Sequence, residues 1–336
     1  MKVNIISLNN AHSLSKDSEL LAFCLKKFYK KLKIVYNYYN FQDNKGSQAD
    51  INIFVGVISN VFFKYAPINI LIIDQHKYDI NWIPYLQRLD YILTKTELAK
   101  SMLDQHFDKN KIINIGWKNV NRFDNSVEKN NNSFLFVCGQ SSYRQLESVL
   151  SLWNDDYPKL TILSGKNYLK NMKIEKKEQD NIEYIEKYLN ENEYTKLLNK
   201  HLVHISISSA SSFSNTLHDC LSSRGVPITI DSFPSRDFVT NNVTGYIVKT
   251  KKKKKIKTSF GSNYIIDESD LKTIIEKVIK IQKEDEILLE EMGEKNKVII
   301  RDSENEFEKN LKSFFDKMID IYKNNKKNKI SHKFEM

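Results

Sequence analysis

The N-terminal part of the chain alternates short apolar runs with stretches of helical periodicity. The runs are nearly continuous, which is typical of strands that are buried on both faces of a sheet. Between them, 17–32 and 97–107 carry apolar residues at the spacing of one helical face. Strands that alternate with helices predict a parallel, doubly wound α/β sheet. The predicted strands are residues 2–8, 34–38, 51–57, 68–73 and 91–93.

The same alternation resumes after a polar segment. Residues 121–132 have no apolar periodicity, and we interpret them as a linker between domains. An amphipathic pattern at 304–322 predicts a last helix that packs back across the domains, ahead of a basic tail at 323–336. In the second region, strands are predicted at 134–138, 160–163, 182–185, 202–207, 227–231 and 244–248, and helices at 145–153, 191–199, 214–222 and 268–281.

Length and composition favour two soluble domains. The 336 residues exceed the roughly 250 to 300 at which single cores stop growing, so we predict domains at 1–120 and 133–303. The hydrophobic share of 40% is ordinary, and no stretch reaches the roughly 18 uninterrupted apolar residues of a membrane span. Polar residues interrupt the first apolar run before the core of a signal peptide is complete. We therefore expect a cytoplasmic protein.

The cysteines and the charge predict neither a metal site nor a nucleic-acid partner. Cys24, Cys138 and Cys220 lie far apart in apolar surroundings, so we expect reduced core thiols rather than a disulfide or zinc site. The formal charge of +10 is concentrated in lysine runs at 251–257 and 323–333, without interleaved aromatic residues on which bases stack. A basic nucleic-acid-binding protein is the least favoured alternative, and its binding would fall steeply with salt.

A glycine-containing turn follows the predicted strand 134–138. Ligands of open α/β sheets bind at such carboxyl ends of strands. Gly139 permits close backbone approach, amides at the start of the next helix can hold phosphate oxygens, and Arg144 can make a bidentate contact to a diphosphate. The alternative is an ordinary strand-to-helix turn with an exposed arginine. The candidate donor-binding residues of this turn are Gly139, Gln140, Ser141 and Arg144.

A serine-rich turn follows the predicted strand 202–207 and leads into a helix. It presents hydroxyls and backbone amides at a helix N-terminus, which suits phosphate or sugar groups. Asp219, about one and a half turns into the helix, is placed to accept both hydrogen bonds of a ribose diol. The alternative makes the serines an N-cap cluster and Asp219 a partner of the helix dipole. The donor-binding candidates are Ser212, Phe213, Ser214, Asn215, Thr216 and Asp219, with Ser211 as a catalytic candidate.

Both turns, with their spacing, resemble the donor domain of retaining GT-B glycosyltransferases of the glycogen-synthase-like superfamily. That domain opens with a strand ending in Gly and followed by a basic residue, a plan that 134–144 follows. Further on, the family carries two acidic residues with seven between them, around Glu-Gly-Phe-Gly. Residues 211–219 occupy that frame, and Phe213 and Asp219 match it in type. The resemblance covers about residues 88–282 and is poor in the first 70.

The resemblance implies two Rossmann-like domains that face each other across a cleft. It also implies transfer of a sugar, with retention, from a nucleoside-diphosphate sugar to a glycan, protein or other hydroxyl acceptor, without a cofactor or metal. Arg144 occupies the position that contacts the diphosphate, and Asp219 the one that binds the ribose. Gln140 stands where a basic residue is common, and Ser211 replaces the acid that usually contacts the sugar. These departures leave open a catalytically degenerate protein that binds a nucleotide sugar.

Three histidines complete the set of candidates. His12 follows the first predicted strand and His76 follows 68–73, so we take both as candidates for contact with the sugar or acceptor. His218 lies beside Asp219 and is a candidate to face the donor. The alternative for a lone histidine at a strand end is a hydrogen-bonded structural role.

Overall fold

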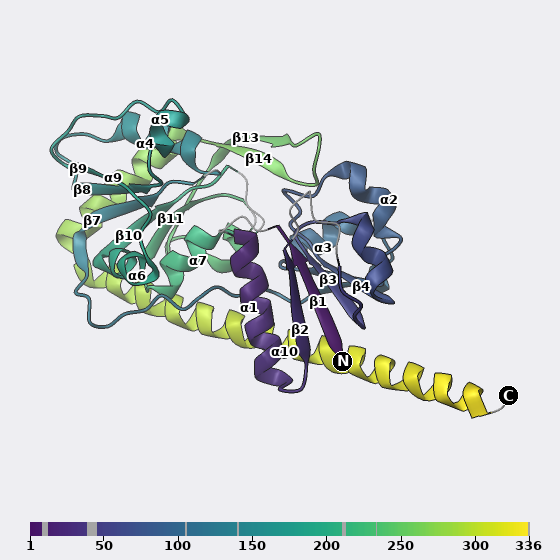
Figure 1. Ribbon diagram of the computed structural model, residues 1–336. Helices are drawn as coiled ribbons and strands as arrows, with labels where there is room; N and C mark the ends of the chain where they lie inside the picture. Colours follow the sequence, from purple (N-terminus) through teal and green to yellow (C-terminus); the bar gives the residue numbers. More distant parts are fainter. Residues whose placement is uncertain are drawn as a thin grey trace. The chain divides into compact units, whose positions relative to one another are not determined.

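The structure is a computed structural model of the whole chain, and it describes residues 1–8, 13–38, 46–104, 106–139, 141–209, 213–232 and 234–334. The chain divides into two compact units (Figure 1). The first unit comprises Met1–Trp117, Lys257–Phe260 and Ser303–Met336, and the second comprises Lys118–Ile256 and Gly261–Asp302.

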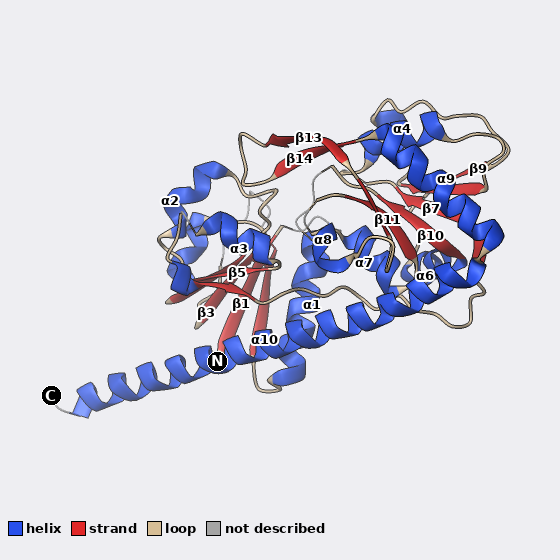
Figure 2. Ribbon diagram, turned by 180° about the vertical axis from the view of Figure 1, so that it is seen from behind, coloured by secondary structure: helices blue, strands red, loops and turns tan. Residues whose placement is uncertain are grey.

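The first unit is built on a six-stranded parallel sheet with the strand order β2-β1-β3-β4-β5-β6. Helices lie beside this sheet, as the α/β alternation of the sequence predicts (Figure 2). The strands are β1 (Lys2–Ser7), β2 (Lys33–Tyr38), β3 (Ile51–Val55), β4 (Ile68–Ile72), β5 (Tyr91–Thr94) and β6 (Ile112–Asn114). The helices are α1 (Ser13–Phe28), η1 (Asn60–Tyr65), η2 (Ile80–Trp82), α2 (Ile83–Leu86), α3 (Glu97–Leu103) and η3 (Lys109–Lys111).

A row of three buried asparagines crosses this sheet. Asn4 of β1 donates to the Asn52 side chain on β3, and Asn52 donates to the Asn69 side chain on β4, each over 2.9 Å. A one-residue slip of any strand would move its asparagine to the other face and leave the neighbouring amide buried without its partner. The row therefore fixes the register of three strands whose apolar residues alone would tolerate several pairings.

The C-terminal helix is longer than the sequence pattern predicts. Helix α10 spans Glu286–Phe334, whereas the pattern places a helix at 304–322 and a frayed tail beyond it. Good helix formers fill the extra turns, and the pair of Asp320 with Lys323 supports the continuation beyond residue 322. In the first unit, Phe307 of α10 packs edge-on against Trp117, with ring centroids 5.0 Å apart. Among the described helices, none combines the length and apolar character that crossing a membrane requires.

The second unit repeats the architecture with a sheet of order β12-β11-β10-β7-β8-β9, in which every pairing is parallel. The strands are β7 (Asn130–Val137), β8 (Lys159–Ser164), β9 (Ile182–Glu186), β10 (His201–Ser206), β11 (Val226–Ile230) and β12 (Tyr246–Val248), and a separate hairpin consists of β13 (Thr250–Lys255) and β14 (Ser262–Ile266). The helices are α4 (Tyr143–Leu152), α5 (Tyr168–Asn171), α6 (Glu191–Lys200), α7 (Asn215–Ser222), α8 (Ser235–Phe238) and α9 (Glu268–Glu284).

The segment predicted as a linker, 121–132, is instead part of the second unit. The backbone amide of Asp124 donates to the side chain of Asn199 over 3.1 Å, and Lys129 donates to the Ser223 carbonyl over 2.8 Å. Strand β7 begins within the segment, at Asn130. The segment lacks apolar periodicity because polar groups, rather than an apolar face, attach it to the unit.

Gly293 lets α10 approach the loop after α7 at close range. A Cβ at this position would lie 2.4 Å from the carbonyl oxygen of Arg224, which is backbone and cannot swing away. We therefore expect Gly293→Ala to lower the free energy of unfolding of the second unit by about 1–3 kcal/mol. Urea denaturation measures this, with Gly139→Ala as the control, because a Cβ at Gly139 meets no atom within 4 Å. Equal stability of the two variants would contradict the close approach.

Candidate functional site

The strand order of the second sheet contains a topological switch point between β7 and β10. The chain adds β8 and β9 on one side of β7, and then crosses over to build β10, β11 and β12 on the other side. Crevices at the carboxyl ends of such neighbouring strands are where open α/β sheets bind ligands. The two turns singled out in the sequence follow these two strands. The structure therefore brings them to one edge of one sheet.

Hydrogen bonds join the two turns directly. The backbone amide and the hydroxyl of Ser209 both donate to the carbonyl oxygen of Ser141, over 2.7 and 2.9 Å. The Ser208 hydroxyl donates to the same carbonyl over 3.4 Å. The Ser141 carbonyl is thus part of the framework that holds the turns together. Of the other candidates here, Gln140, Ser211 and Ser212 lie outside the described residues.

The first turn leaves open space at Gly139. Its amide donates to the Ser142 hydroxyl over 2.9 Å, which fixes the bend ahead of helix α4. Among the described residues other than its chain neighbours, no heavy atom lies within 4 Å of the position that a Cβ would take at Gly139, so ligand atoms have room at this backbone. Arg144, in the first turn of α4, is exposed, and its Nε donates to the Tyr143 hydroxyl over 3.0 Å. The turn thus combines open backbone with a nearby guanidinium.

The second turn enters helix α7 through a strained residue. Ser214 precedes the helix in the left-handed conformation, with φ of 64°, and its side chain does not cap the helix. A non-glycine residue in this region costs free energy and is concentrated at functional sites. Asn215 is exposed and Thr216 is half-buried, so the first turn of α7 is accessible. Uncapped amides at a helix N-terminus suit an anion.

Phe213 and His218 pack on each other instead of presenting their rings to a ligand. Their ring centroids are 3.8 Å apart in a stacked arrangement, and the His218 ring also meets Phe238 edge-on at 4.3 Å. Phe213 is 4% exposed and His218 is 1% exposed. The sequence candidate that had His218 face the donor is therefore wrong: the ring belongs to an aromatic cluster that supports α7 from beneath.

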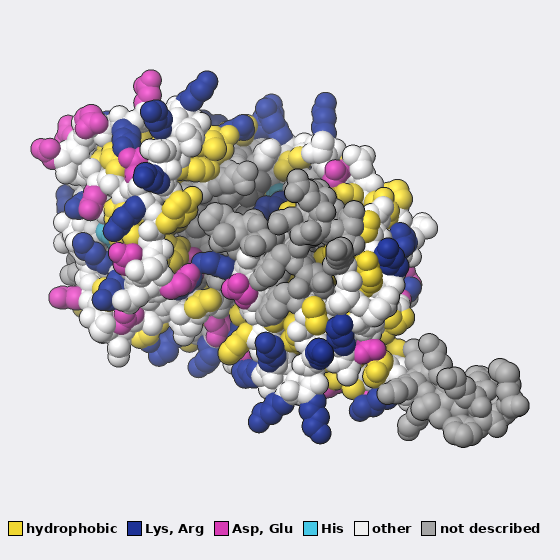
Figure 3. Space-filling view, viewed as in Figure 1, with side chains coloured by type: hydrophobic (Ala, Val, Ile, Leu, Met, Phe, Trp, Pro, Cys, Tyr) yellow, Lys and Arg dark blue, Asp and Glu magenta, His cyan; other side chains and the backbone are white. Residues whose placement is uncertain are grey.

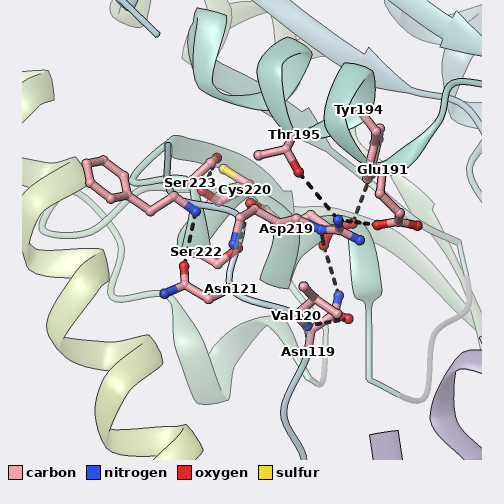
Figure 4. A network of polar contacts seen from close by, with 12 residues as sticks. Asn119, Val120, Asn121, Glu191, Tyr194, Thr195, Asp219, Cys220, Ser222 and Ser223 are labelled. Atoms are coloured by element: carbon pink, nitrogen blue, oxygen red, sulfur yellow. Dashed lines mark hydrogen bonds and ion pairs between the residues drawn. The ribbon is translucent and has the colours of Figure 1, made fainter. Parts of the chain in front are cut away.

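Asp219 lies at the centre of a buried polar network (Figure 4). Its Oδ1 accepts from the Asn119 side chain over 2.9 Å and faces the Arg122 Nε at 3.4 Å. Its Oδ2 accepts from the Tyr194 hydroxyl over 2.9 Å. Arg122, only 4% exposed, also pairs with Glu191. Both carboxylate oxygens are thus engaged by the protein, and the network joins the segment after Trp117 to helices α6 and α7.

The electrostatics of this network favour a charged Arg122 and a neutral Tyr194. Burial opposes the charge on Arg122, but Asp219 and Glu191 raise its pKa above the usual value. Burial raises the pKa of Tyr194 far above its usual value, and the neighbouring Asp219 raises it further. Tyr194 therefore stays a hydrogen-bond donor at any working pH. Because the protein already engages both carboxylate oxygens, this geometry gives no support to the expectation that Asp219 accepts a ribose diol.

The sequence analysis missed Asn119, Arg122 and Tyr194. Asn119 and Arg122 lie 100 and 97 residues from Asp219 along the chain, so no local spacing connects them. The signal that could have indicated the network was Arg122 itself, an arginine in a segment whose other residues are typical of a solvated linker. Its planar guanidinium is the cation best suited to a buried carboxylate.

In the first unit, His76 follows β4 and is half-buried, while His12 lies outside the described residues. A buried ion pair lies at the carboxyl edge of this sheet. Lys95, just after β5, contacts Asp17 of α1 at 2.5 Å, and the Trp117 indole donates to the other Asp17 oxygen over 3.2 Å. The Lys95 ammonium also lies 4.3 Å from the Trp117 ring centroid. This cluster holds α1 and the end of the unit together.

No protein-family model matches the sequence, and no curated protein matches it. Solved structures match its fold. TarM matches with a TM-score of 0.61 at 17% identity, over 87% of this chain and 58% of TarM. A glycosyltransferase from Rickettsia africae ESF-5 matches with a TM-score of 0.64 at 13% identity, over 96% of this chain and 98% of the Rickettsia chain. Anabaena Alr3699/HepE, in complex with UDP and glucose, matches with a TM-score of 0.64 at 9% identity, over 95% of this chain and 99% of the HepE chain.

The chain has the GT-B fold of glycosyltransferases, with two Rossmann-like α/β units, as the sequence resemblance implied. It spans less than two thirds of the length of TarM and nearly the whole of the other two structures. Identities of this size establish the fold alone. Chemistry has to be argued from the site, because one fold hosts many functions.

Proposed function

We propose that this protein is a glycosyltransferase that binds a nucleoside-diphosphate sugar on its second unit, where the turns after β7 and β10 meet. One observation carries the proposal: the switch point of a GT-B fold joins an open glycine turn, at Gly139, to the start of α7, which the side chain of Ser214 leaves uncapped. A diphosphate needs close backbone approach and positive potential, and this edge of the sheet offers both.

The proposed chemistry is stabilisation of a departing nucleoside diphosphate. Negative charge develops on the diphosphate as the bond to the sugar breaks, and preorganised dipoles lower the barrier by binding that charge. The amides at the start of α7 and the guanidinium of Arg144 are the groups suited to this role. We propose transfer with retention to a hydroxyl acceptor, without a cofactor or metal, on the basis of the family resemblance.

Asp219 enters the proposal as a positioning residue. Its carboxylate binds Asn119, Arg122 and Tyr194, so it orients α7 and the start of the second unit. The ribose would then be held by groups other than Asp219. This departure from the resembled family favours a second candidate function, a catalytically degenerate protein that binds a nucleotide sugar without transferring it.

A panel of nucleotide sugars, with release of nucleoside diphosphate as the readout, separates the two functions. The glycosyltransferase predicts turnover of one donor and a loss of about tenfold to hundredfold in Arg144→Ala, because a charge-assisted contact to the leaving group is removed. The matched control is Arg301→Ala, an exposed arginine of α10. Binding without turnover would favour the degenerate protein, and an equal effect of both variants would contradict the role of Arg144.

A further inference from the structure

A lysine-rich hairpin lies between β12 and α9, with its two strands in the second unit and its turn, Lys257–Phe260, in the first. Residues 249–266 contain seven lysines and no acidic residue. Six of these lysines lie in the run 251–257, and the structure places five of them in strand β13, which pairs with β14. Every lysine of β13 is exposed. Basic side chains project from the part of the surface where Figure 1 draws this hairpin (Figure 3).

This lysine ribbon, β13 with β14, concentrates positive charge, which the described residues neutralise by ion pairing only at its base. Lysine is depleted in strands, and side chains on one face of a strand repeat at about 7 Å, within the roughly 8 Å screening length of physiological salt. Lys251 lies 3.5 Å from Asp267 at the base of the ribbon. Within the described residues, Lys252, Lys254 and Lys255 form no ion pair. Lysines protect strand edges from aggregation, and β13 carries five of them in succession.

The ribbon is attached to the candidate donor site by two hydrogen bonds. The backbone amide of Tyr264 in β14 donates to the carbonyl of Ser209, in the turn after β10, over 2.8 Å. The side chain of Gln145 in α4 donates to the Tyr264 carbonyl over 3.4 Å. A ligand held along the ribbon would therefore reach the edge of the sheet where the nucleotide sugar is proposed to bind.

The shape of the ribbon favours a linear polymer. The pairing places Lys252 and Lys254 with Ile265 on one face and Lys253 with Tyr264 on the other. Charge on both faces suits a flexible chain that bends around a narrow ribbon better than a flat lipid surface. Tyr264 is only 8% exposed, with the Lys253 ammonium 5.7 Å from its ring centroid, so it gives nucleic-acid bases no stacking surface.

We infer that the lysine ribbon binds a linear acidic glycan, which presents the acceptor hydroxyl to the donor site. This inference rests on the proposed function, since a glycan carries both the negative charges and the hydroxyls that the two sites require. Lysines act as point charges without the bidentate geometry of arginine. The affinity of the ribbon should therefore depend more on the charge density of the glycan than on the identity of its sugars. The glycan's anionic groups relieve the repulsion among the lysines.

The test is binding of a fluorescently labelled oligogalacturonate, followed by anisotropy at a series of salt concentrations. The triple variant Lys252→Gln, Lys254→Gln and Lys255→Gln removes three charges from the ribbon. We expect its affinity to fall at least about tenfold and the salt dependence of its affinity to become shallower, because fewer counterions are released. The matched control removes three exposed lysines of the first unit: Lys30→Gln, Lys31→Gln and Lys33→Gln.

The outcomes separate this inference from the proposed function. Loss of binding in the ribbon variant alone supports the docking surface, even if no donor is turned over, in which case only the proposed function fails. No binding to the wild type, or equal losses in both triple variants, overturns the inference. Tighter ribbon-dependent binding of single-stranded DNA or of anionic lipid vesicles overturns it as well, because the ribbon would then serve another class of partner.

Discussion

Asp219→Ala is expected to destabilise the second unit by about 3–5 kcal/mol, because it leaves the Arg122 guanidinium buried without its carboxylate. The substitution also removes the acceptor of the Asn119 amide and of the Tyr194 hydroxyl. Urea denaturation followed by far-UV circular dichroism measures the loss. The large effect follows from burial: the Asp219 side chain is 7% exposed and that of Arg122 is 4% exposed.

A surface ion pair of the same type is the control for this prediction. Asp231 and Arg236 face each other with two hydrogen bonds, but their side chains are 29% and 53% exposed. Asp231→Ala should therefore cost less than about 1 kcal/mol. The double variant Asp219→Ala with Arg122→Met should recover part of the loss, since no unpaired charge remains. Equal costs for Asp219→Ala and Asp231→Ala would contradict the buried network.

Acid is expected to destabilise the second unit well above the pH at which its carboxylates are protonated. Burial lowers the pKa of His204 to about 3 and that of His201 to about 4, from an ordinary value of 6.5. Around pH 6.5 the two histidines begin to bind protons in the unfolded chain but not in the folded chain. Their contribution to stability is therefore fully present above pH 6.5 and is lost as the pH falls toward 4. Two such histidines would cost roughly 3–5 kcal/mol between pH 7.5 and pH 4.5.

The contacts of the two rings suggest the variants that test this pH dependence. His204 shares its Nε2 with the carbonyls of Leu198 and His201, and His201 bonds Ser133 through Nδ1. His204→Gln with His201→Asn keeps polar atoms at those positions without a titratable ring. We expect most of the loss between pH 7.5 and pH 4.5 to disappear in urea titrations of this variant. An unchanged loss, as expected for the exposed control His106→Gln, would show that other groups cause it.

The sequence predicts the sheets well, because continuous apolar runs encode buried parallel strands whatever their neighbours are. It could not predict the Asn4, Asn52 and Asn69 row, since the polar residues that fix the register look like interruptions of the apolar pattern. The segment 121–132 was misinterpreted for a related reason. Its polar residues bind distant partners, and a pattern of local spacing contains no information on contacts of that range.

For the site, the sequence predicts which turns meet and predicts less well what each side chain does. Gly139 and Arg144 lie where the strand-to-helix pattern places them, because the carboxyl ends of parallel strands share one edge. Asp219 lies in the expected helix, but its role depends on Arg122, 97 residues away. The lysine run 251–257 gives no strand signal because lysine is a poor strand former, whereas pairing with β14 overrides that preference.

The most direct test of the proposed donor site is calorimetric titration of nucleoside diphosphates into the wild type and into Gly139→Leu. The leucine side chain would occupy the open space at this backbone, where a Cβ meets no atom of the described part of the chain within 4 Å, its own chain neighbours aside. We predict that one nucleoside diphosphate binds the wild type and binds Gly139→Leu at least about tenfold more weakly. The free energy of unfolding of the variant should equal that of the wild type. Unchanged affinity in Gly139→Leu would contradict the account, because the diphosphate would then bind elsewhere.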